Sequence, residues 1–222
     1  MKTSIVICSK NEALTIGEVI KKTKRYTDDF LLIDGHSKDE TRQIAKKMSC
    51  RVFLDDGKGK GDGIRKGIEK SRNEIIVFID ADGSHEPRDI PKLIKPIKEN
   101  KADLVVASRG RGGSDELHGD FEKMMRLVGS SIITLVINLR FKIQLTDSQN
   151  GFRAIRKDVA RKLDLKENIF TIEQEMIMKA LKKGYRISEI ASHEYSRKEG
   201  HSHINLLTMG LRYVWCLIKN IV

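Results

Sequence analysis

The chain of 222 residues is poor in cysteine, proline and aromatic residues. Its three cysteines form an odd, widely spaced set without a CxxC pair, which excludes a disulfide scaffold and argues against a zinc site. Three prolines are too few for a proline-rich linker, and 5% aromatic residues give no stacking platform for single-stranded nucleic acid. The cysteine usage is typical of a reducing compartment, so we expect a cytoplasmic protein.

Long apolar runs are also missing. The longest run without a charged residue is Leu127–Leu139, and its 13 residues fall short of the roughly 20 that a membrane-spanning helix needs. At the N-terminus charge returns at Lys10, which leaves too short an apolar stretch for a signal peptide. We therefore expect neither a transmembrane segment nor a signal peptide.

Basic residues are abundant. The chain has 42 Lys and Arg residues against 31 Asp and Glu residues, for a formal net charge of +11. With 33% charged and 39% hydrophobic residues, the composition predicts one folded, basic domain and not a disordered tail. We expect an anionic partner, and the composition leaves open whether it is nucleic acid, acidic lipid or a phosphorylated small molecule.

The apolar pattern predicts an open α/β sheet. Short β-branched runs at residues 3–8, 30–33, 51–54 and 75–79 alternate with helical patterns at residues 13–24, 38–47 and 64–71. Consecutive apolar residues in these runs are typical of parallel strands that are covered on both faces. After about residue 110 the pattern changes to a glycine-rich loop at 109–113, a helix at 121–141, a polar turn at 147–151, a helix at about 172–183 and a strand-like stretch at 186–194.

Polar residues follow several of the predicted strands, where ligands of open α/β sheets bind. Asp80-Ala81-Asp82 places two carboxylates directly after a strand, and such a pair can hold Mg²⁺ together with substrate phosphates. A solvated acidic turn is the alternative interpretation. The run from Lys58 to Gly63 places glycines and cations at a helix start, which favours anions, although it matches no Walker motif and an ordinary loop explains it equally well.

Four segments together resemble one family in order and spacing: Ser9-Lys10-Asn11-Glu12, then residues 34–41, 57–67 and 80–87. The family is glycosyltransferase family 2 with the GT-A fold, and the resemblance is strongest to dolichyl-phosphate mannose and glucose synthases. It covers about residues 1–200, including Ala107-Ser108-Arg109 and the loop at residues 147–153. The resemblance implies a Rossmann-like, mixed but mostly parallel sheet flanked by helices. We expect a catalytic domain at 1–203 and an amphipathic helix at 204–222.

The resemblance also implies a reaction. It is the inverting transfer of a hexose from a UDP- or GDP-sugar to a polyprenyl (dolichyl) phosphate with Mg²⁺ or Mn²⁺. Asp80 and Asp82 would hold the metal. The residues that would hold the nucleotide are Ser9, Asn11, Glu12, Asp34, Gly35, Lys58, Gly61, Asp80 and Ala81.

The acceptor side is expected to involve Glu175, Arg109 and Arg197, with Asp82 as the fourth residue of the catalytic set. Glu173 and Glu175 both match the acidic position of a family helix, and Glu175 fits it better; a structural pairing of Glu175 with Arg153 is the alternative. A neutral hydroxyl acceptor would need a carboxylate base, whereas a phosphate acceptor is already ionised near pH 7. The two arginines suit phosphate because a guanidinium can donate two parallel hydrogen bonds.

The last segment is predicted to lie on a membrane. Apolar residues recur at helical spacing at positions 207, 211, 214, 215 and 218, and Tyr213 and Trp215 suit the headgroup boundary. Arg212 and Lys219 suit anionic lipid. We therefore expect a peripheral enzyme on the cytoplasmic face of the membrane. In the alternative, this helix and the one at 121–141 pack on each other or form a homodimer interface.

Three other functions compete with lipid glycosylation. A family 2 enzyme can also use a glycan or protein acceptor. The stretch from Phe78 to Ser84 fits the hhDxDG[TS] signature of haloacid-dehalogenase-like phosphatases, although three βα units precede it here. The charge permits a nucleic-acid-binding module, but the cations are dispersed and no recognised reader motif is present, so we expect no nucleic-acid partner.

Overall fold

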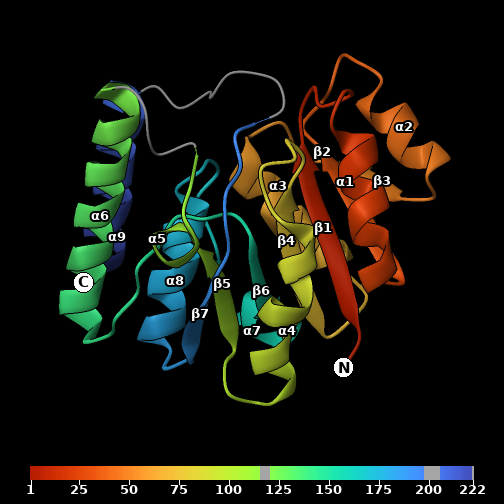
Figure 1. Cartoon of the computed structure of the whole chain (residues 1–222). Helices are drawn as coiled ribbons and strands as arrows, with labels where there is room; N and C mark the ends of the chain where they lie inside the picture. The colour runs from red at the N-terminus through yellow and green to blue at the C-terminus, as the bar shows by residue number, and fades with distance from the viewer. Residues whose placement is uncertain (116–120, 198–205, 222) are drawn as a thin grey trace.

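The computed structural model describes residues 1–115, 121–197 and 206–221. Its centre is a seven-stranded sheet with the strand order β3-β2-β1-β4-β6-β5-β7 (Figure 1). The strands are β1 (Thr3–Ser9), β2 (Asp29–Asp34), β3 (Arg51–Leu54), β4 (Ile75–Asp80), β5 (Leu104–Ser108), β6 (Arg153–Arg156) and β7 (Ile187–Ala191).

The sheet is mixed and mostly parallel, as the sequence predicts. Strands β1 to β4 pair in parallel, and so do β5 and β7. Strand β6 runs antiparallel between β4 and β5 and joins the two parallel parts. The sequence analysis does not anticipate β6, because a four-residue strand that begins and ends with arginine has too little apolar pattern to stand out.

Helices cover both faces of the sheet. Alternate strand residues point to opposite faces, so Ile5 and Ile7 join one core cluster and Val6 joins the other. The first cluster is covered by α1 (Ile16–Thr23), α2 (Thr41–Lys47) and α4 (Ile90–Lys98); the second by α3 (Lys60–Lys70), α7 (Lys157–Lys162) and α8 (Ile172–Lys182). Short helical segments η1 (Lys24–Tyr26), η2 (Pro87–Asp89) and α5 (Arg109–Gly112) complete the connections.

Two boundaries differ from the sequence-based expectation. Helix α3 begins at Lys60 and not near residue 64, because Gly59, with φ of 116°, makes the turn into the helix. The expected loop at 109–113 contains the single helical turn α5, where Ser108 Oγ accepts the backbone N–H of Arg111. The expected domain boundary at residues 203 and 204 lies outside the described residues.

Helices α6 (Phe121–Phe141) and α9 (Leu206–Ile221) lie side by side beyond α8 (Figure 1). Ile133 and Ile137 of α6 and Cys216 and Leu217 of α9 are buried and extend the core. The opposite faces of both helices expose large apolar side chains. We call this surface the α6/α9 face, and it comprises Met124, Met125, Val128, Ile132, Leu135, Leu139, Leu211, Val214, Trp215 and Ile218.

Helix α6 also corrects one expectation. By length and composition alone the stretch Lys123–Phe141 is long and apolar enough to cross a membrane, and only 17% of it is buried. The uncharged run Leu127–Leu139 is bounded by Arg126 and Arg140, whereas the helix continues through both residues. Burial of Ile133 and Ile137 against the rest of the fold nevertheless keeps α6 packed along the protein surface.

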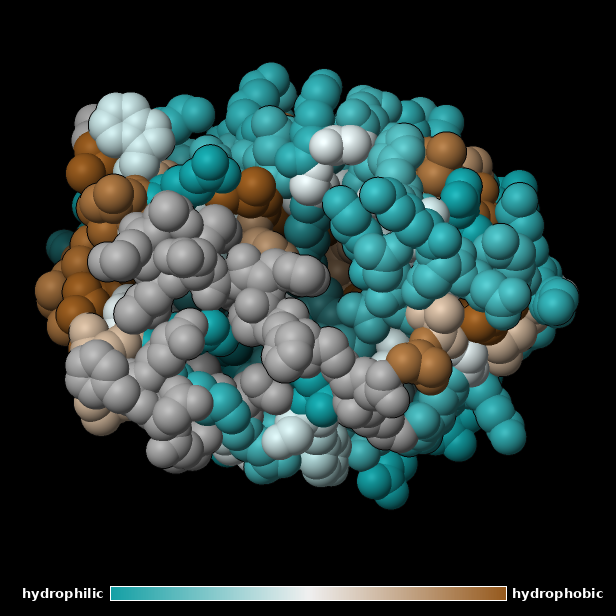
Figure 2. Space-filling model, turned by 90° about the horizontal axis from the view of Figure 1, so that it is seen from above, coloured by the Kyte–Doolittle hydropathy of each residue, from teal (hydrophilic) through white to brown (hydrophobic). Residues whose placement is uncertain are grey.

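The carboxyl ends of the parallel strands form the upper edge of the sheet in Figure 1. Figure 2 looks onto this carboxyl edge, where hydrophilic residues surround a hollow and hydrophobic residues gather to one side. An open α/β fold binds its ligands at this edge, so the hollow is the place to look for the site.

The close contact between α3 and β1 gives a test of the packing. A Cβ on Gly67 would lie 2.5 Å from Val6 Cγ1, whereas a Cβ on Gly129 of α6 would meet nothing within 4 Å. We expect Gly67→Ala to lower the free energy of unfolding by about 1–2 kcal/mol through overpacking. Gly129→Ala should leave it unchanged or raise it by up to about 1 kcal/mol, because alanine favours the helix. Urea unfolding of both variants measures the difference, and equal stabilities would contradict the packing argument.

Candidate active site

The ends of β1 and β2 form one side of the hollow. Gly35 N donates to Ser9 O at 2.8 Å, and Asn11 N donates to Ser37 Oγ at 2.8 Å, so the two loops are tied together. Asp34 is fully buried and its carboxylate accepts from Ser37 N at 2.9 Å and Ser37 Oγ at 2.5 Å. Ser9 Oγ is buried and has no hydrogen-bond partner within the described residues. The structure thus gathers these expected nucleoside residues at one place.

Glu12 lies between this nucleoside side and the carboxylates that follow β4. Its Oε2 accepts a hydrogen bond from Thr15 Oγ1 at 3.0 Å. Burial raises the pKa of Glu12 above its ordinary value, and the negative charges of Asp82 and Asp80 raise it further. Glu12 therefore shares the electrostatic field of both aspartates.

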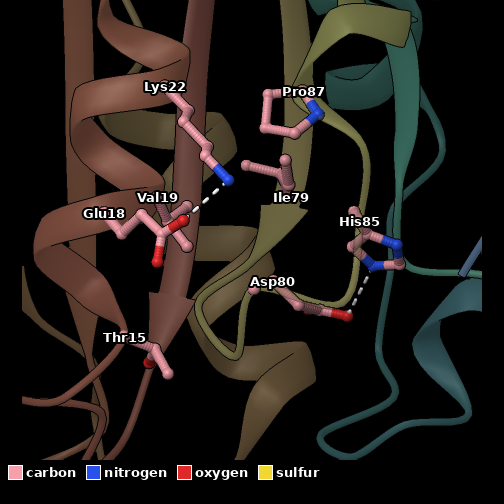
Figure 3. A pocket seen from close by; sticks show the side chains of 9 residues that line it. Thr15, Glu18, Val19, Lys22, Ile79, Asp80, His85 and Pro87 are labelled. Carbon is pink, nitrogen blue, oxygen red and sulfur yellow. Dashed lines mark hydrogen bonds and ion pairs between the residues drawn. The ribbon is translucent and has the colours of Figure 1, made fainter. Parts of the chain in front are cut away.

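A partly buried ion triad lies at the end of β4. Lys60 Nζ, at the start of α3, lies 2.7 Å from Asp80 Oδ1 and 3.0 Å from Glu173 Oε1 on α8. His85 Nε2 lies 3.2 Å from the other Asp80 oxygen, and the two side chains line a small pocket beside α1 (Figure 3). Burial alone would raise the pKa of Asp80, but Lys60 and His85 outweigh it and lower that pKa well below its ordinary range. Asp80 is therefore ionised at neutral pH.

Gly151 closes the triad from the loop before β6. A Cβ on Gly151 would lie 2.8 Å from both Asp80 Oδ2 and Lys60 Nζ, so a side chain at this position would push one of these two groups aside. Arg153 is fully buried and holds the loop, since its Nε donates to Asn150 O at 3.0 Å and its Nη1 donates to Glu173 O at 2.8 Å. The polar turn at residues 147–151 thus packs against Asp80 through Gly151.

The lysine at this site is not the one expected. Lys58 lies in the exposed turn before α3, whereas Lys60 is the first helical residue and points at Asp80. Gly61 N donates to Asn168 O at 2.9 Å, and a Cβ on Gly61 would collide with Glu167 O, so Gly61 packs against that loop. Two lysines that are two residues apart cannot be told apart by charge, and the helix start at Lys60 decides between them.

The acidic residue on α8 also differs from the expectation. Both Glu175 oxygens accept from Lys166 N at 3.0 Å, and Glu175 Oε1 pairs with Lys179 at 2.8 Å, so this carboxylate holds a loop and does not pair with Arg153. Glu173 is the residue that faces Lys60. Residues two apart on a helix point about 200° apart, so only one of the two can reach the site.

Asp82 stands at the mouth of the hollow. It is 6% exposed, and its Oδ1 accepts from Ser84 N at 3.0 Å and from Ser84 Oγ at 2.7 Å. Its Oδ2 faces Arg197 Nε at 3.4 Å. Ala81, between the two aspartates, is buried in the core and supplies spacing.

The donor set suits a hard divalent cation. Within residues 1–115, 121–197 and 206–221 no group of three or more His, Cys, Asp or Glu side chains could hold a metal by itself. Asp80 and Asp82 offer carboxylate oxygens only, and Mg²⁺ typically uses one or two such ligands and completes its shell with phosphate oxygens and water. Mn²⁺ prefers the same type of ligand.

Arg109 follows β5, and its guanidinium is already paired. Its Nε lies 2.6 Å from Asp147 Oδ2, its Nη2 donates to Asp147 Oδ1 at 3.0 Å, and its Nη1 lies 3.6 Å from Glu194 Oε1. The bidentate pair with the buried Asp147 links β5 to the polar turn. The expected phosphate ligand Arg109 thus shapes the site through Asp147.

Comparison with known proteins identifies the family. A profile for glycosyl transferase family 2 matches residues 4–164, which is more than half of the chain. The chain is 25% identical to a dolichol-phosphate mannosyltransferase of Pyrococcus furiosus over 99% of its own length and 64% of that enzyme. It is 27% identical to a UDP-N-acetylglucosamine–dolichyl-phosphate N-acetylglucosaminyltransferase of Methanococcus voltae, covering 84% of this chain and 82% of the relative. The chain belongs to glycosyltransferase family 2, and it is a glycosyltransferase.

A solved structure supports the fold. The glucosyl-3-phosphoglycerate synthase of Mycobacterium tuberculosis, crystallised with Mn²⁺, UDP and phosphoglyceric acid, aligns with a TM-score of 0.76 at 20% identity. The alignment covers 99% of this chain and 78% of the synthase. The GT-A fold that the resemblance implies is therefore confirmed.

Gly151 provides a test of the ion triad. We expect Gly151→Ala to displace Asp80 or Lys60 and to lower glycosyl transfer between about tenfold and a hundredfold, because small misplacements of a reacting group are costly. Gly17→Ala is the control, since a Cβ there meets only ordinary contacts at 3.5 Å and beyond. Circular dichroism confirms folding and initial rates measure transfer. Full activity in the Gly151 variant would mean that the close approach has no catalytic importance.

Proposed function

We propose that the protein transfers a hexose from a nucleoside-diphosphate sugar to a polyprenyl phosphate at the cytoplasmic face of a membrane, with Mg²⁺ or Mn²⁺. The proposal rests on one arrangement: Asp80 and Asp82 lie at the carboxyl end of β4, Arg197 faces Asp82, and α8, which carries the Lys60 partner Glu173, packs against α9. The two dolichyl-phosphate transferases among the relatives support this choice of acceptor.

The donor nucleotide lies along the ends of β1, β2 and β4 in this proposal. Ser9, Asn11, Glu12, Asp34 and Gly35 hold the nucleoside. The buried Ser9 Oγ, which lacks a hydrogen-bond partner in the described part of the chain, is then satisfied by the bound nucleoside. These residues would also distinguish a UDP-sugar from a GDP-sugar.

Asp80 and Asp82 would hold the divalent cation beside the diphosphate of the donor. The cation supplies electrostatic stabilisation of the negative charge that develops on the departing diphosphate. Lys60, which is 15% exposed, adds a fixed positive charge beside Asp80. Burial alone would lower the pKa of Lys60, but Asp80 and Glu173 raise it above its ordinary value, so Lys60 stays charged while the donor binds.

In this proposal Arg197 binds the acceptor phosphate. Arg197 faces Asp82, so a phosphate that it holds lies beside the metal and the sugar. A phosphate oxygen is already ionised and attacks without a base. This fits the state of Glu173, whose carboxylate is paired with Lys60.

The membrane contact is assigned to the α6/α9 face. Trp215 is 66% and Leu211 is 76% exposed, and Arg140, Lys142, Arg212 and Lys219 supply cations on the same two helices or at their ends. Tyr213, expected at the headgroups, instead turns inward and its hydroxyl donates to Phe170 O at 3.4 Å. The Phe170 ring lies 5.4 Å from Lys60 Nζ, so one residue links α9 to the ion triad. A lipid-borne phosphate can thus meet the site without leaving the membrane surface.

A glycan or protein acceptor is the second candidate. Its neutral hydroxyl would need a carboxylate base, and Glu173 is the acidic residue of α8 that reaches the site. The ion pair with Lys60 disfavours that role, because it stabilises the negative charge and weakens the base. Membership of family 2 leaves the phosphatase and nucleic-acid interpretations without support.

Asp82 tests the metal site. We expect Asp82→Asn to lose more than nine-tenths of transfer and the Mn²⁺-dependent part of donor binding, because a neutral amide of the same shape removes a metal ligand without making a cavity. Calorimetric titration of UDP- and GDP-sugars with and without Mn²⁺ measures binding directly. Asp164→Asn is the control, since that side chain is 72% exposed. Retention of more than a tenth of wild-type turnover at saturating Mn²⁺ would overturn the metal role of Asp82.

The α6/α9 face is tested by vesicle flotation. We expect the wild type to float with vesicles that contain anionic lipid and Trp215→Glu to float several-fold less, because a charge opposes burial in the headgroup region. Gln43→Glu adds the same charge on an exposed position of α2, at the other edge of the sheet, and should float normally. Donor binding should be equal in all three proteins. A stable dimer that fails to float at low salt would favour the homodimer interface instead.

A further inference from the structure

Residues 192–197, here called the strap, follow β7 and cross the carboxyl edge. One side of the strap pairs with the loop after α5. Glu194 N donates to Gly113 O at 3.1 Å, and Asp115 N donates to Glu194 O at 2.8 Å. The loop after α5 therefore carries the middle of the strap.

The other end of the strap reaches the metal-binding carboxylates. Tyr195 N donates to Ser84 O at 2.8 Å, and Ser84 lies two residues after Asp82 and donates to its carboxylate. Two residues further on, Arg197 Nε lies 3.4 Å from Asp82 Oδ2. The position of Arg197 thus depends on how firmly the strap is held.

His193 lies in the strap with an oxygen acceptor at each ring nitrogen. Its Nδ1 lies 3.0 Å from the carbonyl oxygen of Gly112, and its Nε2 lies 3.0 Å from Asp115 Oδ1. A carbonyl and an ionised carboxylate can only accept hydrogen bonds, and a neutral imidazole has a single N–H. Only the imidazolium form satisfies both contacts.

Neighbouring residues hold the His193 ring in a defined position. Gly113 has a φ of 89°, and a Cβ there would lie 2.9 Å from His193 Nδ1, so the loop can approach the ring because it has a glycine at this position. The Tyr195 ring meets the imidazole edge-on at a centroid distance of 4.8 Å. Asp115 fastens a second point of the strap, since its Oδ2 accepts from Ser196 N at 3.3 Å.

We propose that His193 is a positioning residue for the acceptor phosphate, because its imidazolium fastens the strap to the loop after α5 and so holds Arg197 at the site. The inference rests on the proposed function, which assigns the acceptor phosphate to Arg197. His193 itself touches neither Asp80 nor Asp82 and acts through the strap.

The charges around His193 determine how the attachment of the strap changes with pH. Among the described residues, the groups that face it are Asp115 and Glu194, with Tyr195 against the ring and Arg109 reaching Glu194 from α5. The hydrogen bond to Gly112 O, and then Asp115 and Glu194, raise the pKa of His193 above its ordinary value. A raised pKa means that the fastening is complete below the ordinary histidine pKa and is lost as the pH rises through the folded value.

The first experiment needs no substrate. Histidine ring NMR of the full chain, with the His193 signal assigned from its absence in His193→Gln, gives the pKa and the protonation of both nitrogens. Hydrogen exchange of the Glu194 and Tyr195 amides, corrected for intrinsic rates, should lose protection through the same midpoint. Asp115→Asn should move that midpoint to lower pH. His193→Arg, which stays charged, should keep the amides protected at high pH.

The second experiment uses transfer to a short-chain polyprenyl phosphate in detergent. The acceptor phosphate has its own ionisation near pH 6, so the KM of the wild type is divided by that of His193→Gln at each pH, which cancels the acceptor's ionisation. We expect His193→Gln to raise the acceptor KM about threefold at pH 6 and hardly at all at pH 8.5, as for an exposed charge-assisted contact. The donor KM should not change. His193→Arg should keep the low KM at both pH values.

The outcomes separate the two proposals. A His193 that titrates at or below the ordinary value, or strap amides indifferent to its charge, overturns the positioning role even in an active enzyme. A ratio of acceptor KM values that is flat with pH also overturns it. Absence of transfer with every donor, together with the expected NMR and exchange results, refutes the proposed function and leaves the fastening of the strap in place.

Discussion

The ammonium group of Lys60, buried between Asp80 and Glu173, is the interaction on which the site depends. Two carboxylates brought together away from water would repel each other, and removal of one partner from a buried pair is strongly destabilising. Lys60 makes their proximity possible and ties β4, α3 and α8 to one point. The same charge keeps Asp80 ionised and ready for a cation. Structural stability and the proposed metal binding therefore depend on a single group, and a substitution at Lys60 should affect both.

Helices α6 and α9 are coupled to this point through α8. Gln174 Nε2 donates to Tyr213 O at 2.9 Å, one residue away from Glu173, and Tyr213 in turn reaches Phe170. Helix α9 is thus packed directly against the segment that carries the triad. If the α6/α9 face binds lipid as proposed, this packing holds that face in a fixed relation to the ion triad. An enzyme whose acceptor is anchored in a bilayer would require such a relation.

The sequence predicts the parts of the molecule that depend on periodicity. Parallel strands, their covering helices and the outward apolar positions of α9 follow from apolar spacing, and the resemblance correctly implies the GT-A fold. The sequence does not distinguish Lys60 from Lys58 or Glu173 from Glu175, because the choice depends on where a helix begins and which way it faces. The sequence does not predict strand β6 for a related reason, because β6 pairs with β4 and β5, which are far away in the chain.

Strand β6 also has a consequence for how the molecule assembles. The parallel group β3-β2-β1-β4 is complete by residue 80, and β5 can join the sheet only when β6, which is made later, fills the place between them. Such a non-local pairing is slow to form because the intervening chain must first be brought back. During synthesis β4 therefore keeps an open edge until about seventy further residues have emerged. Gly151 lies only two residues before β6, so the segment that completes the sheet also brings Gly151 to Asp80 and Lys60.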